Sequence, residues 1–209
     1  MEFIFDIETN GLPKFQVNMY NKRLKEFPPA DLLEAYDTAR IVSIAWVIVD
    51  ANKDIIQQEY YLIKPDGFNI PPEVIRIHGI TNEFASENGI PISDMFSSIH
   101  KAISRCSKIV SYNIQFDINV LKSELIRYQM QDVLECVASK PAHCAMIMAQ
   151  LFMKKSSFPK LSLAYEYIFR EPIQGAHNAM DDTISCYKVY KAISLYYAEE
   201  NQCFPNISV

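Results

Sequence analysis

The sequence predicts a mixed α/β fold in a single domain, residues 1–209. Three apolar segments near the N-terminus have the pattern of strands in a meander, and helical periodicity dominates the rest of the chain. The composition agrees, because 49% hydrophobic and 22% charged residues are typical of globular proteins. A chain of 209 residues can bury a full core without disulfides or a structural metal.

The first strand is expected at Glu2–Glu8, where polar and apolar residues alternate and Phe and Ile are frequent. Turn residues end it, and residues 14–40 follow as a polar, Pro-containing insertion with a short helix near residues 31–36. The continuous apolar run Ile41–Val49 predicts a second strand. After a hairpin turn, Ile55–Ile63 returns as the third strand.

A short helix is expected at residues 71–77, since two prolines favour its first turn. Apolar residues recur at helical spacing in residues 93–104 and again in residues 117–128. Between these helices, residues 108–112 form a short apolar run that is typical of a buried strand. Three more helices are expected, at residues 145–153, 161–169 and 181–198.

The charge balance argues against nucleic-acid binding through a broad positive field. With 20 Lys and Arg against 25 Asp and Glu, the net charge is −5, so a polyanion would need a local patch or bound cations. No membrane partner is expected. The longest apolar run, Ile41–Val49, is much shorter than the roughly 20 residues of a membrane-spanning helix.

Cysteine usage indicates a reducing, intracellular and cytoplasmic location. The five cysteines are odd in number and form no CxxC pair, so free thiols are expected. Cys136, His143 and Cys144 lie close together, but no second pair of ligands is present to complete a zinc site. Acidic residues near the N-terminus interrupt the apolar segment that a signal peptide would need.

Two carboxylates lie on the first expected strand. Asp6 and Glu8 are two residues apart, so both side chains point to the same face. Adjacent carboxylates repel each other unless a cation lies between them, and such oxygen-rich sites suit Mg²⁺ or Mn²⁺. Two solvated acids on an exposed strand would give the same pattern, so this motif alone does not establish a site.

Two further motifs lie where helices are expected to begin. Asn113 follows a short strand, and Asp117 opens the next helix, where an acid would also complement the helix dipole. His177 and Asp182 lie around the start of the last helix, and five helical steps would leave about 140° between their side chains. They converge only if His177 precedes the regular helix, as Gly175 allows.

The order of these three motifs resembles that of the DEDDh exonuclease family, which includes the proofreading epsilon subunit of bacterial replicative polymerase, RNase T and oligoribonuclease. Supporting matches are Tyr61–Pro65, Ile77–Thr81, and Leu161–Leu163 followed by Tyr165. The resemblance extends from Phe3 to the final helix. It implies a ribonuclease-H-like fold, which is a mixed five-stranded sheet flanked by helices.

The resemblance also implies the roles of individual residues. Asp6, Glu8, Asp117 and Asp182 match the four acids that bind two divalent cations, Mg²⁺ or Mn²⁺, and His177 matches the general base. Two such ions activate the attacking water, neutralise the phosphate and stabilise the leaving oxygen. The residues expected to contact the substrate are Thr9, Asn10, Gly11, Leu12, Ile77, His78 and Asn113.

Some neighbouring residues are expected to have structural roles only. Phe116 is assigned to the core, and Lys154, Lys155 and Lys160 are assigned to the solvated surface. Asn178 occupies the position at which a related subfamily has a tyrosine, so the histidine class is indicated.

The expected activity is 3′-5′ exonuclease cleavage of single-stranded or mismatched DNA, which releases nucleoside 5′-monophosphates. A 3′-5′ exoribonuclease and a catalytically silent nucleic-acid-binding or scaffold protein are the alternatives. The expected partners are single-stranded 3′ ends, with DNA favoured over RNA, together with a second copy of the chain or a polymerase. The insertion at residues 14–40 is expected to act as a lid or clamp on single-stranded ends.

Overall fold

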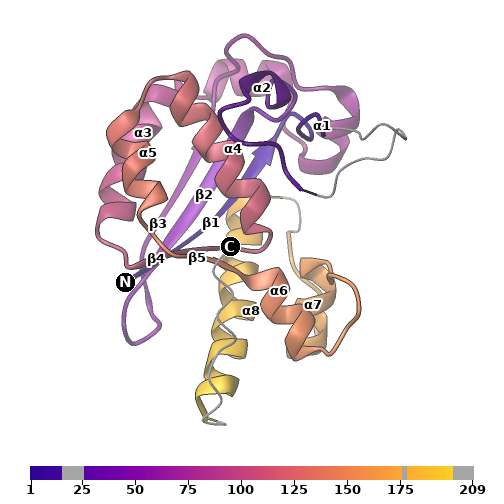
Figure 1. Cartoon of the computed structure of the whole chain (residues 1–209). Helices are drawn as coiled ribbons and strands as arrows, with labels where there is room; N and C mark the ends of the chain where they lie inside the picture. The colour runs from indigo at the N-terminus through magenta and orange to yellow at the C-terminus, as the bar shows by residue number, and fades with distance from the viewer. Residues whose placement is uncertain (16–25, 176–177, 200–209) are drawn as a thin grey trace.

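The structure, a computed structural model, describes residues 1–15, 26–175 and 178–199. It contains the expected mixed five-stranded sheet, with the strand order β3-β2-β1-β4-β5 (Figure 1). The central strand β1 is antiparallel to β2 and parallel to β4, while β2 and β3 are antiparallel and β4 and β5 are parallel. The strands are β1 (Glu2–Thr9), β2 (Ile41–Val49), β3 (Ile55–Leu62), β4 (Lys108–Ser111) and β5 (Ala142–Cys144).

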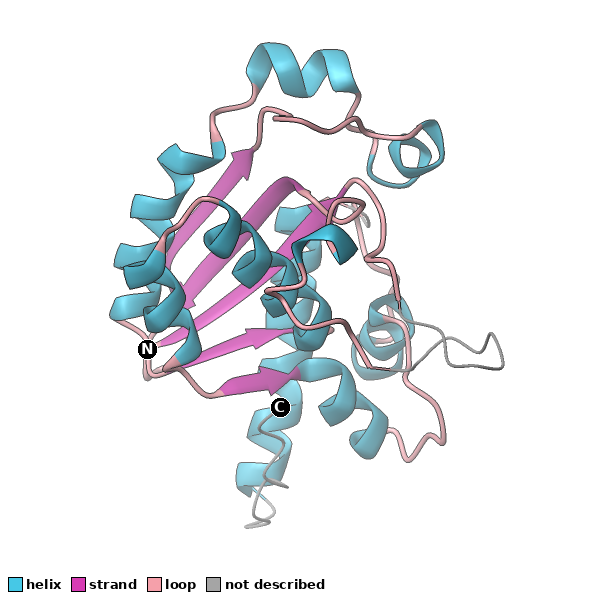
Figure 2. Cartoon of the chain, turned by 45° about the horizontal axis from the view of Figure 1, so that its top comes forward, coloured by secondary structure: helices cyan, strands magenta, loops and turns pink. Residues whose placement is uncertain are grey.

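Helices cover both faces of this sheet (Figure 2). One core forms between the sheet and α3, α4 and α5, and a second core forms between the sheet and α6, α7 and α8. The helices are η1 (Leu33–Ala35), α1 (Pro72–His78), α2 (Asn82–Asn88), α3 (Ile92–Ser104), α4 (Ile114–Arg127), α5 (Gln131–Ala138), α6 (Ala145–Phe152), α7 (Leu161–Phe169) and α8 (Ala179–Glu199).

The alternation of side chains along β1 decides which face carries its acids. Phe3, Phe5 and Ile7 are buried in the core on the α3–α5 side. Ile4 is buried in the other core, with side chains of α6, α7 and α8. Successive residues of a strand point to opposite faces, so the acids at positions 6 and 8 lie on the same face as Ile4, toward α8.

Residues 26–40, the second part of the predicted insertion, fold against the body of the protein. Ala35 and Tyr36 are buried, and the Tyr36 hydroxyl donates to the Pro28 carbonyl over 2.6 Å. The backbone amide of Lys14 donates to the Ala35 carbonyl over 2.7 Å. These residues are therefore packed on the body of the protein. The expected role of residues 14–40 as a lid or clamp stays a prediction, and residues 16–25 lie outside the described residues.

Several short elements were not predicted from the sequence. Helices α2 and α5 and strand β5 have few buried residues; α2 buries Ala85 alone, so it has no apolar stripe to recognise. Helix α4 begins at Ile114, three residues before the expected start, because Ile114 is itself fully buried. Asp117 therefore lies within the first turn of α4 instead of opening the helix.

The described cysteines agree with the expected free thiols. Cys106, Cys144 and Cys186 are buried, Cys136 is half-buried, and none of these four forms a disulfide. Within the described residues, no helix combines the length and the apolar character that crossing a membrane would require.

Candidate active site

Three of the predicted acids meet at the end of the central strand. Asp6 and Glu8 project from β1, and Asp182 projects from the first turn of α8. One carboxylate oxygen of each residue lies within 4.8 Å of one from each of the others. The side chains are partly buried, so the cluster remains accessible from solvent.

Helix α8 is held in the position that brings Asp182 to the strand. The buried Thr183 hydroxyl donates to the Ala179 carbonyl one turn earlier in α8 over 2.6 Å, and its oxygen lies 3.3 Å from the Ala45 carbonyl of β2. Ala45 is the register partner of Asp6. At the start of the helix, the Asn178 carbonyl accepts the Asp182 amide over 2.9 Å. The buried Thr183 side chain therefore packs α8 against β2 beside the acids of β1, and its sequence position carried no signal of this contact.

The fourth predicted acid, Asp117, approaches from the adjacent strand and helix. Strands β1 and β4 are parallel, so their carboxyl ends lie at the same edge of the sheet, where α4 begins. Asp117 is 3% exposed, and the Ser111 hydroxyl at the end of β4 donates to its Oδ2 over 2.5 Å. Sequence reasoning did not identify Ser111, because its partner is defined by the strand-to-helix geometry.

The acids raise one another's pKa. Burial, followed by repulsion from Asp117, Glu8 and Asp182, holds the pKa of Asp6 well above its usual range. Burial and repulsion from Asp182 raise the pKa of Glu8 to about 7. Burial raises the pKa of Asp117 to about 7 despite the hydrogen bond from Ser111.

The chemistry of this group fits divalent metal ions. None of the ion pairs among the described residues involves Asp6, Glu8 or Asp117. Carboxylate oxygens are the preferred ligands of Mg²⁺ and Mn²⁺, and a bound cation removes the repulsion that raises these pKa values. The four acids Asp6, Glu8, Asp117 and Asp182 are therefore the residues that could hold the metal.

A cleft of about 550 Å³ opens beside Glu8, and we call it the Leu12 cleft. Leu12 and Ile77 are 61% and 55% exposed on its walls, and Phe116 adds an aromatic ring. Phe116 packs on the core as expected, but it also lines the cleft, which the sequence did not indicate. The predicted contact residues that line this cleft are Thr9, Asn10, Gly11, Leu12, Ile77 and His78.

The turn that carries Leu12 depends on a glycine. The Thr9 hydroxyl donates to the Gly11 carbonyl over 2.7 Å, and the Thr38 hydroxyl donates to the Leu12 carbonyl over 2.8 Å. Gly11 has a φ of +151°, and a Cβ at this position would lie 2.9 Å from the Thr38 carbonyl oxygen. A side chain cannot fit there, so glycine allows the turn to approach residue 38 closely.

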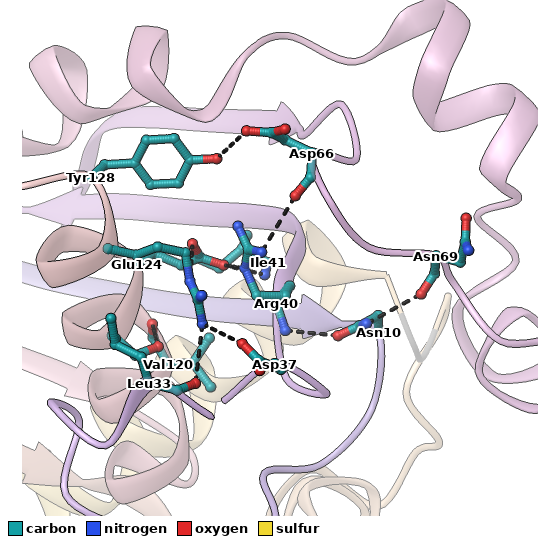
Figure 3. Close-up of polar contacts among 12 residues, drawn as sticks. Asn10, Leu33, Asp37, Arg40, Ile41, Asp66, Asn69, Val120, Glu124 and Tyr128 are labelled. Carbon is teal, nitrogen blue, oxygen red and sulfur yellow. Dashed lines mark hydrogen bonds and ion pairs between the residues drawn. The ribbon is translucent and has the colours of Figure 1, made fainter. Parts of the chain in front are cut away.

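Asn10 ties this turn to a buried ion pair (Figure 3). Its Oδ1 accepts the Arg40 amide over 2.7 Å, and its Nδ2 donates to the Asn69 carbonyl over 3.2 Å. Arg40 Nε lies 2.6 Å from Glu124 Oε1, and both side chains are buried. Glu124 also accepts the Ile41 amide, so one carboxylate joins α4 to β2 behind the cleft.

The remaining predicted residues lie elsewhere or outside the described part. Asn113 lines a second cleft, on the Asp182 side of the cluster, and does not reach the Leu12 cleft. Burial lowers the pKa of His78, so this imidazole is neutral at pH 7. Asp181, the neighbour of Asp182, is exposed and does not join the cluster. His177 lies outside the described residues, and α8 begins at Ala179, after it in the sequence.

Comparison with protein families gives a match over most of the chain. Residues 3–190 match the family model RNase T, which is described as an exonuclease family. No curated protein matches the sequence significantly.

Three solved structures that superpose on this chain are described as nucleases. Escherichia coli Exonuclease I in complex with a dT13 oligonucleotide superposes with a TM-score of 0.71 at 18% identity, over 96% of this chain and 42% of that chain. Exonuclease X in complex with 5′-overhanging duplex DNA superposes with a TM-score of 0.60 at 19% identity, over 100% of this chain and 98% of that chain. Cell-death related nuclease 4 superposes with a TM-score of 0.65 at 13% identity, over 93% of this chain and 64% of that chain. This chain thus spans less than half the length of Exonuclease I.

Proposed function

The chain belongs to the RNase T exonuclease family, and on this basis we propose that it is a metal-dependent 3′-5′ exonuclease of the DEDDh class. The observation that carries the proposal is the convergence of Asp6, Glu8 and Asp182 from distant parts of the sequence. Glu8 of this cluster also lines the Leu12 cleft. The family depends on divalent metal ions, and the site offers them carboxylate oxygens.

The four acids would hold two ions, Mg²⁺ or Mn²⁺, at the scissile phosphate. When bound, such ions offset the phosphate charge and lower the pKa of the attacking water. Asp6 and Glu8 would orient the phosphate at the end of β1, and Asp117, fixed by Ser111, would support it from α4. His177 would accept the proton of the water, since an imidazole titrates near neutral pH.

The Leu12 cleft would take the terminal nucleotide. Leu12, Ile77 and Phe116 offer apolar surface for the flat faces of a base, and the neutral His78 offers a polar ring beside them. Single-stranded or mismatched DNA is the substrate that we propose, because a base must be unpaired to enter such a cleft. The DNA complexes of Exonuclease I and Exonuclease X support this choice.

Matched DNA and RNA oligonucleotides with a 5′ label test this proposal in Mg²⁺ and in Mn²⁺. We expect a ladder that shortens from the 3′ end, faster on DNA, and a loss of about 10³-fold in Asp6→Asn. A faster ladder on RNA would identify an exoribonuclease instead. The absence of a ladder on either substrate would contradict the proposal and favour a binding role.

A further inference from the structure

A second cleft of about 490 Å³ opens on the other side of the acid cluster, and we call it the Phe158 cleft. Asp182 lies on its edge, whereas Glu8 lies on the edge of the Leu12 cleft. The residues of the Phe158 cleft that carry the argument are Tyr112, Asn113, Phe158, Pro159, Lys160 and Asp182.

The aromatic ring of this cleft is exposed on a fixed segment of backbone. Phe158 is 58% exposed, although its neighbour Pro159 is buried. The buried Tyr112 hydroxyl donates to the Pro159 carbonyl over 2.9 Å, and the Lys160 carbonyl accepts the amide of Ala164 in α7 over 3.0 Å. The fold therefore fixes the backbone at Phe158 and leaves its side chain exposed to solvent beside the acid cluster.

The connection between α6 and α7 that carries Phe158 also carries three lysines, in a chain whose net charge is −5. Lys154 and Lys155, in the same connection between α6 and α7, are both exposed, and Lys160 lines the cleft itself. The sequence predicted that these lysines are solvated surface. That prediction accounts for Lys154 and Lys155, but Lys160 shares a cleft with an acid of the catalytic cluster.

The two clefts are adjacent at the acid cluster, and the scissile phosphate of a substrate joins the terminal nucleotide to the rest of the strand. If the terminal nucleotide enters the Leu12 cleft, the rest of the strand must leave the scissile phosphate in another direction. Oxygens of Glu8 and Asp182, which border the two clefts, lie within 4.8 Å of each other. A single phosphate can therefore bridge from one cleft to the other.

We propose that the Phe158 cleft binds the retained part of a single-stranded substrate, with a base stacked on Phe158 and a backbone phosphate on Lys160. This inference rests on the proposed exonuclease function and adds a requirement on the substrate. The first nucleotides upstream of the scissile bond must be unpaired, because a base stacks on an aromatic ring only when it is free of its partner strand.

An abasic substrate tests the stacking directly. A tetrahydrofuran residue replaces the second or the third nucleotide from the 3′ end of a DNA oligonucleotide, and kcat/KM is measured for removal of the terminal nucleotide. In the wild type, we expect one of these replacements to lower kcat/KM by about tenfold. Phe158→Ala should lower kcat/KM on intact DNA by a similar factor and show no further loss on the abasic strand.

Tyr167→Ala is the matched control, because this exposed aromatic residue of α7 does not line the cleft. It should retain wild-type discrimination against the abasic strand. Phe158→Ala with wild-type kcat/KM on intact DNA, or with an undiminished abasic penalty, would overturn the inference. So would a wild type that tolerates an abasic residue at both positions.

The phosphate contact has its own measurement. Lys160→Ala should weaken oligonucleotide binding and reduce the slope of log affinity against log salt concentration by about 0.7, the value for one phosphate of a single strand. Lys101→Ala, an exposed lysine of α3, should leave the slope unchanged. An unchanged slope in Lys160→Ala would contradict this contact.

Binding in Ca²⁺, measured by fluorescence anisotropy with the same intact and abasic strands, separates this inference from the proposed function. A wild-type chain that hydrolyses no strand would contradict the proposed function. In that case binding would still test the cleft. Weaker binding of the abasic strand by the wild type, with no such difference in Phe158→Ala, would support the assignment, and equal binding of both strands by the wild type would overturn it.

Discussion

The two ends of strand β1 carry acids in opposite electrostatic environments. At one end, burial alone would raise the pKa of Glu2, but ion pairs with Lys53 at 2.8 Å and Lys108 at 3.2 Å outweigh it, and the pKa is lowered. At the other end, Asp6 and Glu8 are buried with further acids, and their pKa values are raised.

This contrast distinguishes an acid that lysines neutralise from Asp6 and Glu8, which lie together without an ion pair among the described residues. Glu2 is compensated by the protein itself, so its charge stabilises the fold without any ligand. The fold places Asp6 and Glu8 together at a cost in stability that a bound cation can offset. Four experiments test this contrast.

The two ends should differ most in their effect on activity. Asp6→Asn removes a carboxylate of the proposed metal site and should lower kcat on single-stranded DNA by about 10³-fold. Glu2→Gln changes an acid of the same strand that lies far from the cluster, and its kcat should stay near that of the wild type. Comparable losses in the two variants, measured by release of mononucleotides, would show that the contrast is wrong.

The pH dependence of stability should have opposite signs at the two ends. For Glu8, the pKa rises from 4.5 in the unfolded chain to about 7 in the fold, so the folded state holds more protons between these values. The free energy of unfolding of the metal-free protein should fall as pH rises through this window. At about 1.4 kcal/mol per pKa unit, the loss is on the order of 3 kcal/mol.

Glu8→Gln isolates this contribution in denaturant unfolding with EDTA present. The variant should match the wild type near pH 4 and be more stable than it at pH 8. A difference between the two proteins that stays constant with pH would contradict the raised pKa.

Metal binding should offset the loss of folding stability that repulsion among the charged acids causes. At 100 times its Kd, Mg²⁺ should stabilise the wild type by about 2.7 kcal/mol and raise its Tm accordingly. The shift should disappear in Asp6→Asn and persist in Glu2→Gln. A shift in Tm that survives Asp6→Asn would place the stabilising ion at another site.

The smallest change in stability should come from Glu2, at the end of β1 where lysines neutralise the acid. Glu2→Gln removes the ion pairs with Lys53 and Lys108 and should cost about 1 kcal/mol of unfolding free energy at pH 7. Because the pKa of Glu2 is lowered in the fold, its contribution is present above pH 4.5 and is lost as pH falls below it. The difference between wild type and variant should therefore vanish in acid.

The sequence predicted the parts of the fold that depend on local pattern. Ile41–Val49 was assigned to its observed bounds, since a continuous apolar run of this length between turn residues is typical of a buried strand. Helices α2 and α5 were missed because each buries only one or two residues. The packing of residues 26–40 could not be predicted, because Tyr36 is buried by partners distant in the sequence.

The acids of the site were predictable because their residue type carries the chemistry. Asp6, Glu8 and Asp182 were named from spacing and resemblance, and the structure brings them together. Ser111 and Thr183 were not named, since a hydroxyl acquires its role only from the group that the fold places beside it. The roles of these acids in catalysis remain predictions.

The sequence positions of the four acids also determine when the site can exist during synthesis. Asp6 leaves the ribosome long before Asp182 does, because most of the domain lies between them in the sequence. Helix α8 must pack on β1 and β2 before the cluster is complete. A nascent or truncated chain that lacks this helix therefore has no complete metal site, and the proposed nuclease stays silent until α8 has been made and has folded into place.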